Sequence, residues 1–420
     1  MAYIIFNTLL LCACLVSCVE TIVPSNIPHF ENGLTRNELI KIYFLEGLKY
    51  SEIVLFLFCY HKIKISVRQL KRVLQGLNLR RRPTQYSPVH VIINIIKEEM
   101  RVSGECIGYR SMWKRLMKDH GVVVKRNEVM QIMRHLNPNA TEQRKAHKLK
   151  RRIYSVRGPN YVWHIDGYDK LKPFGFCIHG CIDGYSRRIM WLEVACSNND
   201  PAVIAKYYLD CLKHFQLAPR ILRADNGTEN SRVSFLQPLF RYHSTDSMAG
   251  IKSFMYGKST ANQKIEQWWG TMRKLGIHWW INFFKDIWDS GLFDIQNMVI
   301  KECVRFCFMD ALQTDLDRIA QHWNSHDIRR QKRYVELPSG KPDVMYFVPE
   351  ITNGYDFKTY VNPDDVNMCI QLYGKEKETC SAKFKEIINI IKPGVRVPVH
   401  PYEALLLFIE LNDILETYLS

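Results

Sequence analysis

The sequence predicts a mixed α/β domain, a sheet flanked by helices, preceded by all-helical units. Two observations predict this fold class. From residue 160 onward, short apolar runs bounded by turn residues are typical of strands, and they are interrupted by helical patterns. Between residues 36 and 136 the apolar residues instead recur at helical spacing. The change of period indicates at least two structural units.

The first helical unit is predicted at residues 36–82, with helices at 38–47, at 50–60 and after Ser66. Ser66 is a good N-cap, and apolar residues line one face of the helix that follows it. The opposite face is basic, with Arg68, Lys71 and Arg72. A three-helix unit whose last helix is basic resembles a helix-turn-helix DNA reader. A helical bundle with a solvated basic face is the alternative interpretation.

A second helix-turn-helix-like unit is predicted at residues 88–140. One helix starts at Gly108, and another covers 127–136. We expect the first of them to bury Met112, Trp113, Leu116 and Met117, and to expose Arg110, Lys114, Arg115 and Lys118. Residues 141–157 are strongly basic and are predicted to be a linker, a phosphate contact or a nuclear-import signal.

Composition restricts the class of protein. A chain of 420 residues is long enough for two to four domains. The excess of 58 Lys and Arg over 42 Asp and Glu gives a formal charge of +16, which favours a polyanionic partner, most commonly nucleic acid. The 13 cysteines include no Cys-x-x-Cys pair, which argues against a zinc ribbon and a disulfide scaffold. His322 and His326 lie four apart, but no cysteine pair accompanies them to complete a zinc site.

The N-terminal segment, residues 1–20, is set apart by an uncharged apolar run at 2–18. The run has the length of a signal peptide but lacks its basic start, and it is slightly short for a membrane span. A secretion signal, an anchor and an error of the gene model all stay open.

The main domain is predicted at residues 158–349. Its strands are expected at 161–165, 175–182, 188–194 and 219–224, and its helices at 199–215 and 262–275. Three strands in a meander, then a helix and another strand, form a mixed sheet.

Three acids stand at structurally similar places. Asp166 ends the first strand in WHIDGY, Asp225 ends the fourth in RADNGTEN, and Glu266 lies on the helix in GKSTANQKIEQWWGTMR. Asp-Asn-Gly by itself is ordinary turn chemistry. If the first and fourth strands are neighbours and the helix packs across their ends, however, the three carboxylates converge.

This pattern resembles the catalytic core of the retroviral-type integrases and the DDE transposase superfamily, as found in integrase-core proteins derived from transposable elements. The resemblance covers about residues 163–349. It includes Asp166, then Asp225 with Asn226 and Gly227, then Glu266, in the family's order. Further similar text is SRRIMWLEV (186–194), the Ser-x-x-Asn-x-x-x-Glu-x-Trp phrase (259–268), HWNSHDIRR (322–330) and PSGKPDVMY (338–346).

The resemblance implies an RNase H-like fold and DNA cleavage and strand transfer by an Asp-Asp-Glu triad. Two Mg²⁺ or Mn²⁺ ions would hold the reacting oxygens in line, and such hard ions prefer carboxylate ligands. Asp166 would bind both ions, Asp225 one and Glu266 the other. Related enzymes work as multimers on paired DNA ends, so a homo-oligomer in the nucleus is expected.

Residues near the three acids have lesser claims. Arg273 and, more weakly, Lys264 are candidates for DNA phosphate contacts, with a solvated helix face as the alternative. Trp268 and Trp269 are predicted to be core residues rather than base-stacking platforms. The acids interpreted as structural or incidental are Asp169, Asp183, Glu193 and Glu229.

The chain departs from the retroviral pattern in two ways. Asp225 and Glu266 are separated by 40 residues, slightly more than usual, with the extra length expected at 242–257. Helical units replace the N-terminal zinc domain, in the manner of DNA transposons. The extension at 350–420 receives no predicted role. The alternative function is a domesticated, catalytically silent protein that keeps the fold for nucleic-acid binding.

Overall fold

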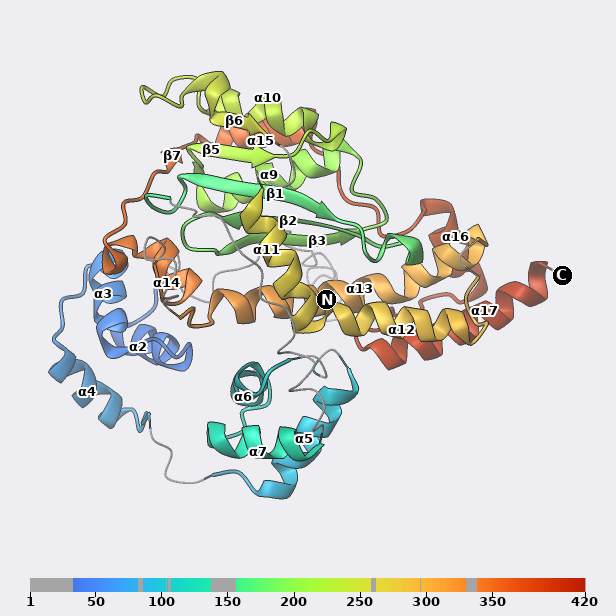
Figure 1. Ribbon diagram of the computed structural model, residues 1–420, viewed down its shortest axis with the longest axis horizontal. Helices are drawn as coiled ribbons and strands as arrows, with labels where there is room; N and C mark the ends of the chain where they lie inside the picture. Colours follow the sequence, from blue (N-terminus) through green and yellow to red (C-terminus); the bar gives the residue numbers. More distant parts are fainter. Residues whose placement is uncertain are drawn as a thin grey trace, which may run out of the picture.

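The computed structural model (Figure 1) describes residues 33–81, 86–102, 104, 107–136, 156–257, 262–294, 296–329 and 338–419. The predicted N-terminal segment 1–20 and nearly all of the predicted basic linker 141–157 lie outside these residues. Within them, no helix combines the length and the apolar character that crossing a membrane requires.

A five-stranded mixed sheet forms the centre of the main domain. Strands β1 (Val162–Tyr168), β2 (Cys177–Asp183) and β3 (Ile189–Ala195) form the predicted antiparallel meander. Strand β5 (Ile221–Ala224) then pairs parallel to β1, and β6 (Phe254–Tyr256) pairs parallel to β5. The order β3-β2-β1-β5-β6 confirms the predicted mixed sheet and makes β1 and β5 neighbours.

Helices cover both faces of this sheet because its strands alternate apolar side chains between two cores. One core packs Trp163 and Ile165 of β1 against α9 (Pro201–Phe215). The other packs Ile178 and Ile182 of β2 against several helices. These are α11 (Gln263–Met272), α12 (His278–Asp289) and α13 (Met298–Asn324).

The outer edge of β3 is closed by side chains rather than by another strand. Gln313 of α13 accepts from the Val194 N–H at 3.0 Å and donates to the Leu192 carbonyl at 3.0 Å. Asn324, three turns further along α13, does the same for both backbone groups of Ile189, at 2.8 and 3.1 Å. These amides satisfy backbone groups that an edge strand would otherwise leave open.

The first helical unit has the three predicted helices, α2 (Arg36–Leu45), α3 (Tyr50–His61) and α4 (Val67–Gly76). Ser66 caps α4 as predicted, in a reciprocal capping box with Gln69. The apolar core of this unit continues into α14 (Pro342–Phe347) and the residue after it through Val344 and Val348. The unit therefore packs directly on the main domain.

The second unit contains α5 (Val89–Arg101), α6 (Tyr109–Lys118) and α7 (Arg126–Leu136). The predicted faces of α6 are partly wrong. Met117 is 45% exposed, whereas Arg115 is 3% exposed and forms an ion pair with the equally buried Glu99 of α5 at 2.9 Å. A buried Arg is tolerated here because its charge is paired. Lys114 is also drawn inward and donates to the Ser325 carbonyl at 2.9 Å.

The C-terminal extension belongs to the same cores. α15 (Pro363–Tyr373) packs on the α9 side through Val366 and Cys369. α16 (Ala382–Ile391) and α17 (Pro401–Leu419) join the core around α13, and Figure 1 shows them alongside α12 and α13. A short β4 (Leu217–Ala218) also pairs with β7 (Thr359–Tyr360) of the extension. The extension thus stabilises the main domain.

Candidate active site

Asp166 and Asp225 lie side by side at one edge of the sheet. The parallel register of β1 and β5 pairs Trp163 with Leu222 and His164 with Arg223. Continuing this register by two residues brings Asp166 level with Asp225. Two strands that run in the same direction therefore bring both acids to one edge of the sheet, as the sequence predicted. The prediction that Asp166 ends its strand is wrong, because β1 continues to Tyr168.

Asn262 fixes the start of the helix that carries Glu266. Its Nδ2 donates to the Ile165 carbonyl at 2.8 Å, and its Oδ1 lies 2.6 Å from Nδ1 of His164. Since that oxygen can only accept, His164 carries its proton on Nδ1. Burial lowers the pKa of His164 to about 4, so the ring is neutral at pH 7. These two hydrogen bonds join Asn262, the residue before α11, to His164 and Ile165, the two residues before Asp166.

Trp269 makes a second contact between α11 and β1. Its indole Nε1 donates to Oδ2 of Asp166 at 3.0 Å. Gly180 of β2 is the cross-strand partner of Asp166 and leaves room for this ring, because a Cβ there would lie 2.9 Å from Trp269 Cη2. Glu266 lies between the two contacts, four residues after Asn262 and three before Trp269. Residues three and four apart share a helix face, so Glu266 faces the same edge.

The turn after β5 holds Asp225. Its Oδ1 accepts from the Gly227 N–H at 3.3 Å and from Nδ2 of the buried Asn230 at 3.1 Å. Asn230 also donates to Oε1 of Glu229 at 3.1 Å, which brings Glu229 close to the site. A Cβ at residue 227 would lie 1.9 Å from that same carboxylate oxygen, so a larger residue there would displace the Glu229 side chain.

The three carboxylates share one electrostatic environment. The pKa of Asp166 is raised to about 7, first by burial and then by the nearby charges of Glu266 and Asp225, against hydrogen bonds from Trp269 and Gly167 that lower it. In the described part of the chain neither Asp166 nor Asp225 pairs with a Lys or Arg side chain. Asp166 and Asp225 are like charges without a Lys or Arg partner among the described residues, and such a pair favours a cation.

The donor chemistry suits Mg²⁺ or Mn²⁺, since all three side chains offer hard carboxylate oxygens. The conformation of the side chains stops short of a common coordination sphere. Across the described residues, no group of three or more His, Cys, Asp and Glu side chains lies close enough to hold a metal ion. This also applies to His322 and His326. His322 instead lies 3.2 Å from an Asp119 oxygen.

The two predicted DNA contacts on α11, Arg273 and Lys264, differ in solvent exposure. Arg273 is exposed at the end of the helix, seven residues after Glu266 and on the same face. Lys264 is only 7% exposed, so it lies neither on a solvated face nor where DNA could reach it in this conformation. Trp268 and Trp269 are 2% and 5% exposed, which confirms the core prediction, although Trp269 also contacts Asp166. Lys258 to Ala261 lie outside the described residues.

Asp183 organises a turn, as predicted. Its carboxylate accepts from Ser186 N–H and Oγ at 2.8 and 2.7 Å and from Asn160 N–H at 2.9 Å. Glu193 is buried on β3 and pairs with Lys377 at 2.6 Å. Asp169 is exposed and pairs with Lys172 at 3.1 Å. Each of these three acids has a structural partner. Glu229, interpreted from the sequence as incidental, differs because Asn230 links it to Asp225.

Two residues important for the geometry were missed by sequence reasoning. Asn262 and Trp269 join Glu266 at spacings of four and three, and this shared face was the available signal. Neither residue type indicates its role, since an amide and an indole on a helix are usually packing or capping residues.

Comparison with known proteins agrees with this architecture. Residues 153–337 match the family model described as the integrase core domain. No curated protein matches the chain. Together with the five-stranded mixed sheet and its flanking helices, this match shows that residues 153–337 are an integrase core domain of the retroviral-type integrase and DDE transposase superfamily, with an RNase H-like fold.

Proposed function

We propose that this chain is an integrase- or transposase-like DNA recombinase that cleaves phosphodiesters and transfers strands with Asp166, Asp225 and Glu266. One observation carries the proposal. The parallel register of β1 and β5 brings Asp166 level with Asp225, and Asn262 and Trp269 join the helix of Glu266 to β1. An integrase core domain in residues 153–337 supports a polynucleotidyl-transferase fold.

Asp166, Asp225 and Glu266 would together hold two Mg²⁺ or Mn²⁺ ions. Bound there, the ions would supply charge stabilisation for the attacking and leaving oxygens of an in-line displacement. Because the three side chains do not yet share a coordination sphere, binding involves a rotamer change. Glu266 is exposed on the first turn of α11.

The remaining residues position these acids and the substrate. Asn262 and Trp269 fix the register of α11 against β1, which keeps Glu266 opposite Asp166. Exposed Arg273 would bind a DNA phosphate on the same face. Lys264 is buried, so it is not a candidate for this phosphate contact. A nuclear location and assembly as a homo-oligomer on paired DNA ends remain predictions.

A strand-transfer assay tests the proposal. The full-length protein is incubated with a short labelled duplex and Mn²⁺ or Mg²⁺, and products of nicking and joining are resolved. Asp225→Asn is expected to abolish both products while DNA binding persists. The matched control, Asp169→Asn, removes an exposed acid that pairs with Lys172 and should retain activity.

The same assay separates the alternative function. A wild-type chain that binds the duplex but yields neither product with either cation is a nucleic-acid-binding protein that has kept the fold. Equal activity in wild type and Asp225→Asn would also reject the proposed triad.

A further inference from the structure

Helix α4 presents a polar face that no other part of the described chain covers. Its buried residues, Leu70 and Leu74, point into the first helical unit. At about 100° per residue, Arg68, Arg72 and Gln75 fall near the opposite pole of the helix. All three are exposed. Lys71 lies at the border of this face.

Most basic side chains around α4 are already engaged with the protein. The Lys71 ammonium lies 5.5 Å from the centre of the Tyr50 ring. The Arg81 guanidinium lies 4.2 Å from the centre of the Phe44 ring and donates to the Leu48 carbonyl. Arg68 and Arg72, by contrast, make no hydrogen bond, ion pair or ring contact with any described residue.

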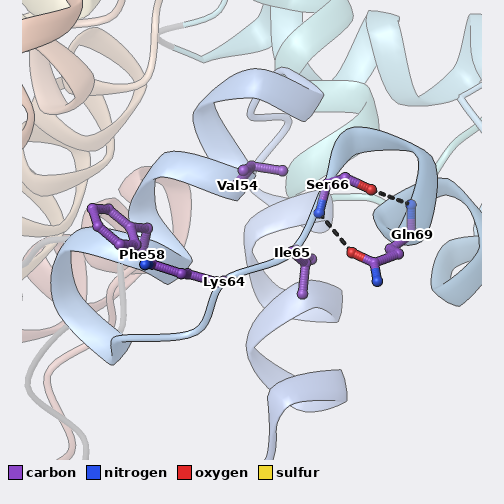
Figure 2. A pocket seen from close by; sticks show the side chains of 6 residues that line it. All are labelled: Val54, Phe58, Lys64, Ile65, Ser66 and Gln69. Atoms are coloured by element: carbon purple, nitrogen blue, oxygen red, sulfur yellow. Dashed lines mark hydrogen bonds between the residues drawn. The ribbon is translucent and has the colours of Figure 1, made fainter.

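Gln69 is also engaged, which restricts what it can read. Figure 2 shows the side-chain Oε1 of Gln69 accepting from the Ser66 backbone N–H at 2.8 Å. The backbone N–H of Gln69 donates to Ser66 Oγ at 3.2 Å. These residues line a surface hollow with Val54, Phe58, Lys64 and Ile65. Adenine is read by an amide that offers a donor and an acceptor together. With its acceptor occupied, Gln69 does not fit that pattern, whereas Gln75 keeps both groups exposed.

The segment of sequence that carries this face contains no acidic residue. No Asp or Glu occurs in the sequence between Glu52 and Glu98. Free guanidinium groups in such a field fit a polyanion, and their planar donor pairs match the O6 and N7 acceptors of guanine.

The helical unit that carries α4 is packed against the main domain. The unit shares its apolar core with Val344 and Val348, and Nζ of Lys341 donates to the Gly47 carbonyl at 2.6 Å. Tyr60 donates to the Phe347 carbonyl. These contacts hold α4 in a fixed relation to the main domain and reduce the ordering cost of placing it in a DNA groove.

We propose that α4 reads DNA sequence from the major groove, with Arg68 and Arg72 each donating two hydrogen bonds to a guanine. The inference rests on the proposed function, in which DNA is the substrate. Four residues of helix rise about 6 Å, so the two guanines would lie about two base-pair steps apart. Lys71 and Arg81, held by aromatic rings, would contribute charge without sequence information.

A selection experiment tests this reading. The full-length protein is bound to a randomised duplex library without divalent cations, so that the DNA stays intact, and bound sequences are counted. Wild type should enrich two closely spaced guanines. Arg68→Lys and Arg72→Lys keep the charge but lose the planar donor pair. Each should therefore lose discrimination at one position, by roughly 5- to 150-fold, with an unchanged salt dependence of binding.

The matched control is Lys41→Ala, which removes an exposed basic residue from α2 of the same unit. It should keep the sequence preference. Wild-type binding without preference, or the wild-type preference retained in both Arg→Lys variants, overturns the inference. If such a protein still joins DNA strands, only the reading fails. If the protein binds no DNA, the proposed function fails as well.

Discussion

Trp268 and Trp269 allow a controlled test of what holds Asp166. Both indoles are buried on α11, and they differ in the hydrogen bonding of the N–H. The Trp269 N–H donates to Asp166 at 3.0 Å, whereas the Trp268 Nε1 is buried without a partner in the described part of the chain. Trp→Phe at either position keeps an aromatic ring and removes the N–H.

The two substitutions should differ in cation binding. A hydrogen bond to a charged group contributes about 1.5–3 kcal/mol, and removing a partner that orients a metal ligand typically weakens metal binding about 10- to 100-fold. Because Asp166 is only partly buried, we expect the lower end, about tenfold, for Trp269→Phe. Trp268→Phe removes an unsatisfied donor whose burial costs about 1–3 kcal/mol, which offsets part of the lost packing.

Calorimetric titration with Mn²⁺ at pH 8 measures the first effect, and urea unfolding measures the second. Trp269→Phe should bind Mn²⁺ about tenfold more weakly, while Trp268→Phe should bind it like wild type. Equal weakening in both variants would show that loss of ring volume, rather than the N–H, disturbs the site. Unchanged binding in Trp269→Phe would refute the positioning role.

Three further outcomes are expected. The pKa of Asp166 is raised to about 7, so the native state binds a proton more tightly than the unfolded chain and loses stability as pH rises from about 4 to 7. Asp166→Asn should flatten this slope and stabilise the cation-free protein at pH 8 in thermal unfolding. Gly180→Ala should displace Trp269, whose ring lies 2.9 Å from the added Cβ, and weaken Mn²⁺ binding in the same titration. Gln313→Leu leaves two backbone groups of β3 unpaired and should cost about 2–4 kcal/mol in urea unfolding, against a smaller loss for an exposed control such as Gln296→Leu.

The sheet and its acids could be predicted because local signals coincided with the tertiary arrangement. The apolar run before Asp225 marked a strand end, whereas β1 continues two residues beyond Asp166 to Tyr168. A parallel pairing of these strands was enough to bring the two acids level. The observed strands begin or end one to two residues from most predicted limits. The fourth strand was predicted from residue 219, but a turn divides β4 from β5 there.

Contacts set by tertiary packing could not be predicted in the same way. Arg115 is buried with its charge paired to Glu99 of a neighbouring helix, and Met117 of the same helix is 45% exposed. The pKa of Glu99 also depends on residues that pack against it from other elements. Burial favours the neutral carboxyl, but Arg318 of the main domain and Arg115 outweigh it and hold the pKa of Glu99 at about 2. Helical periodicity identifies a face, whereas its partner decides which charges that face can bury.

The Asp-Asn-Gly turn shows why its structural and functional interpretations do not compete. The turn hydrogen bonds from Gly227 and Asn230 both reach Oδ1 of Asp225, and Oδ2 makes none with the described residues. A carboxylate fixed through one oxygen presents the other in a defined direction, which is what a ligand for a hard cation requires. Ordinary turn chemistry is therefore the means by which this strand end holds its acid in place.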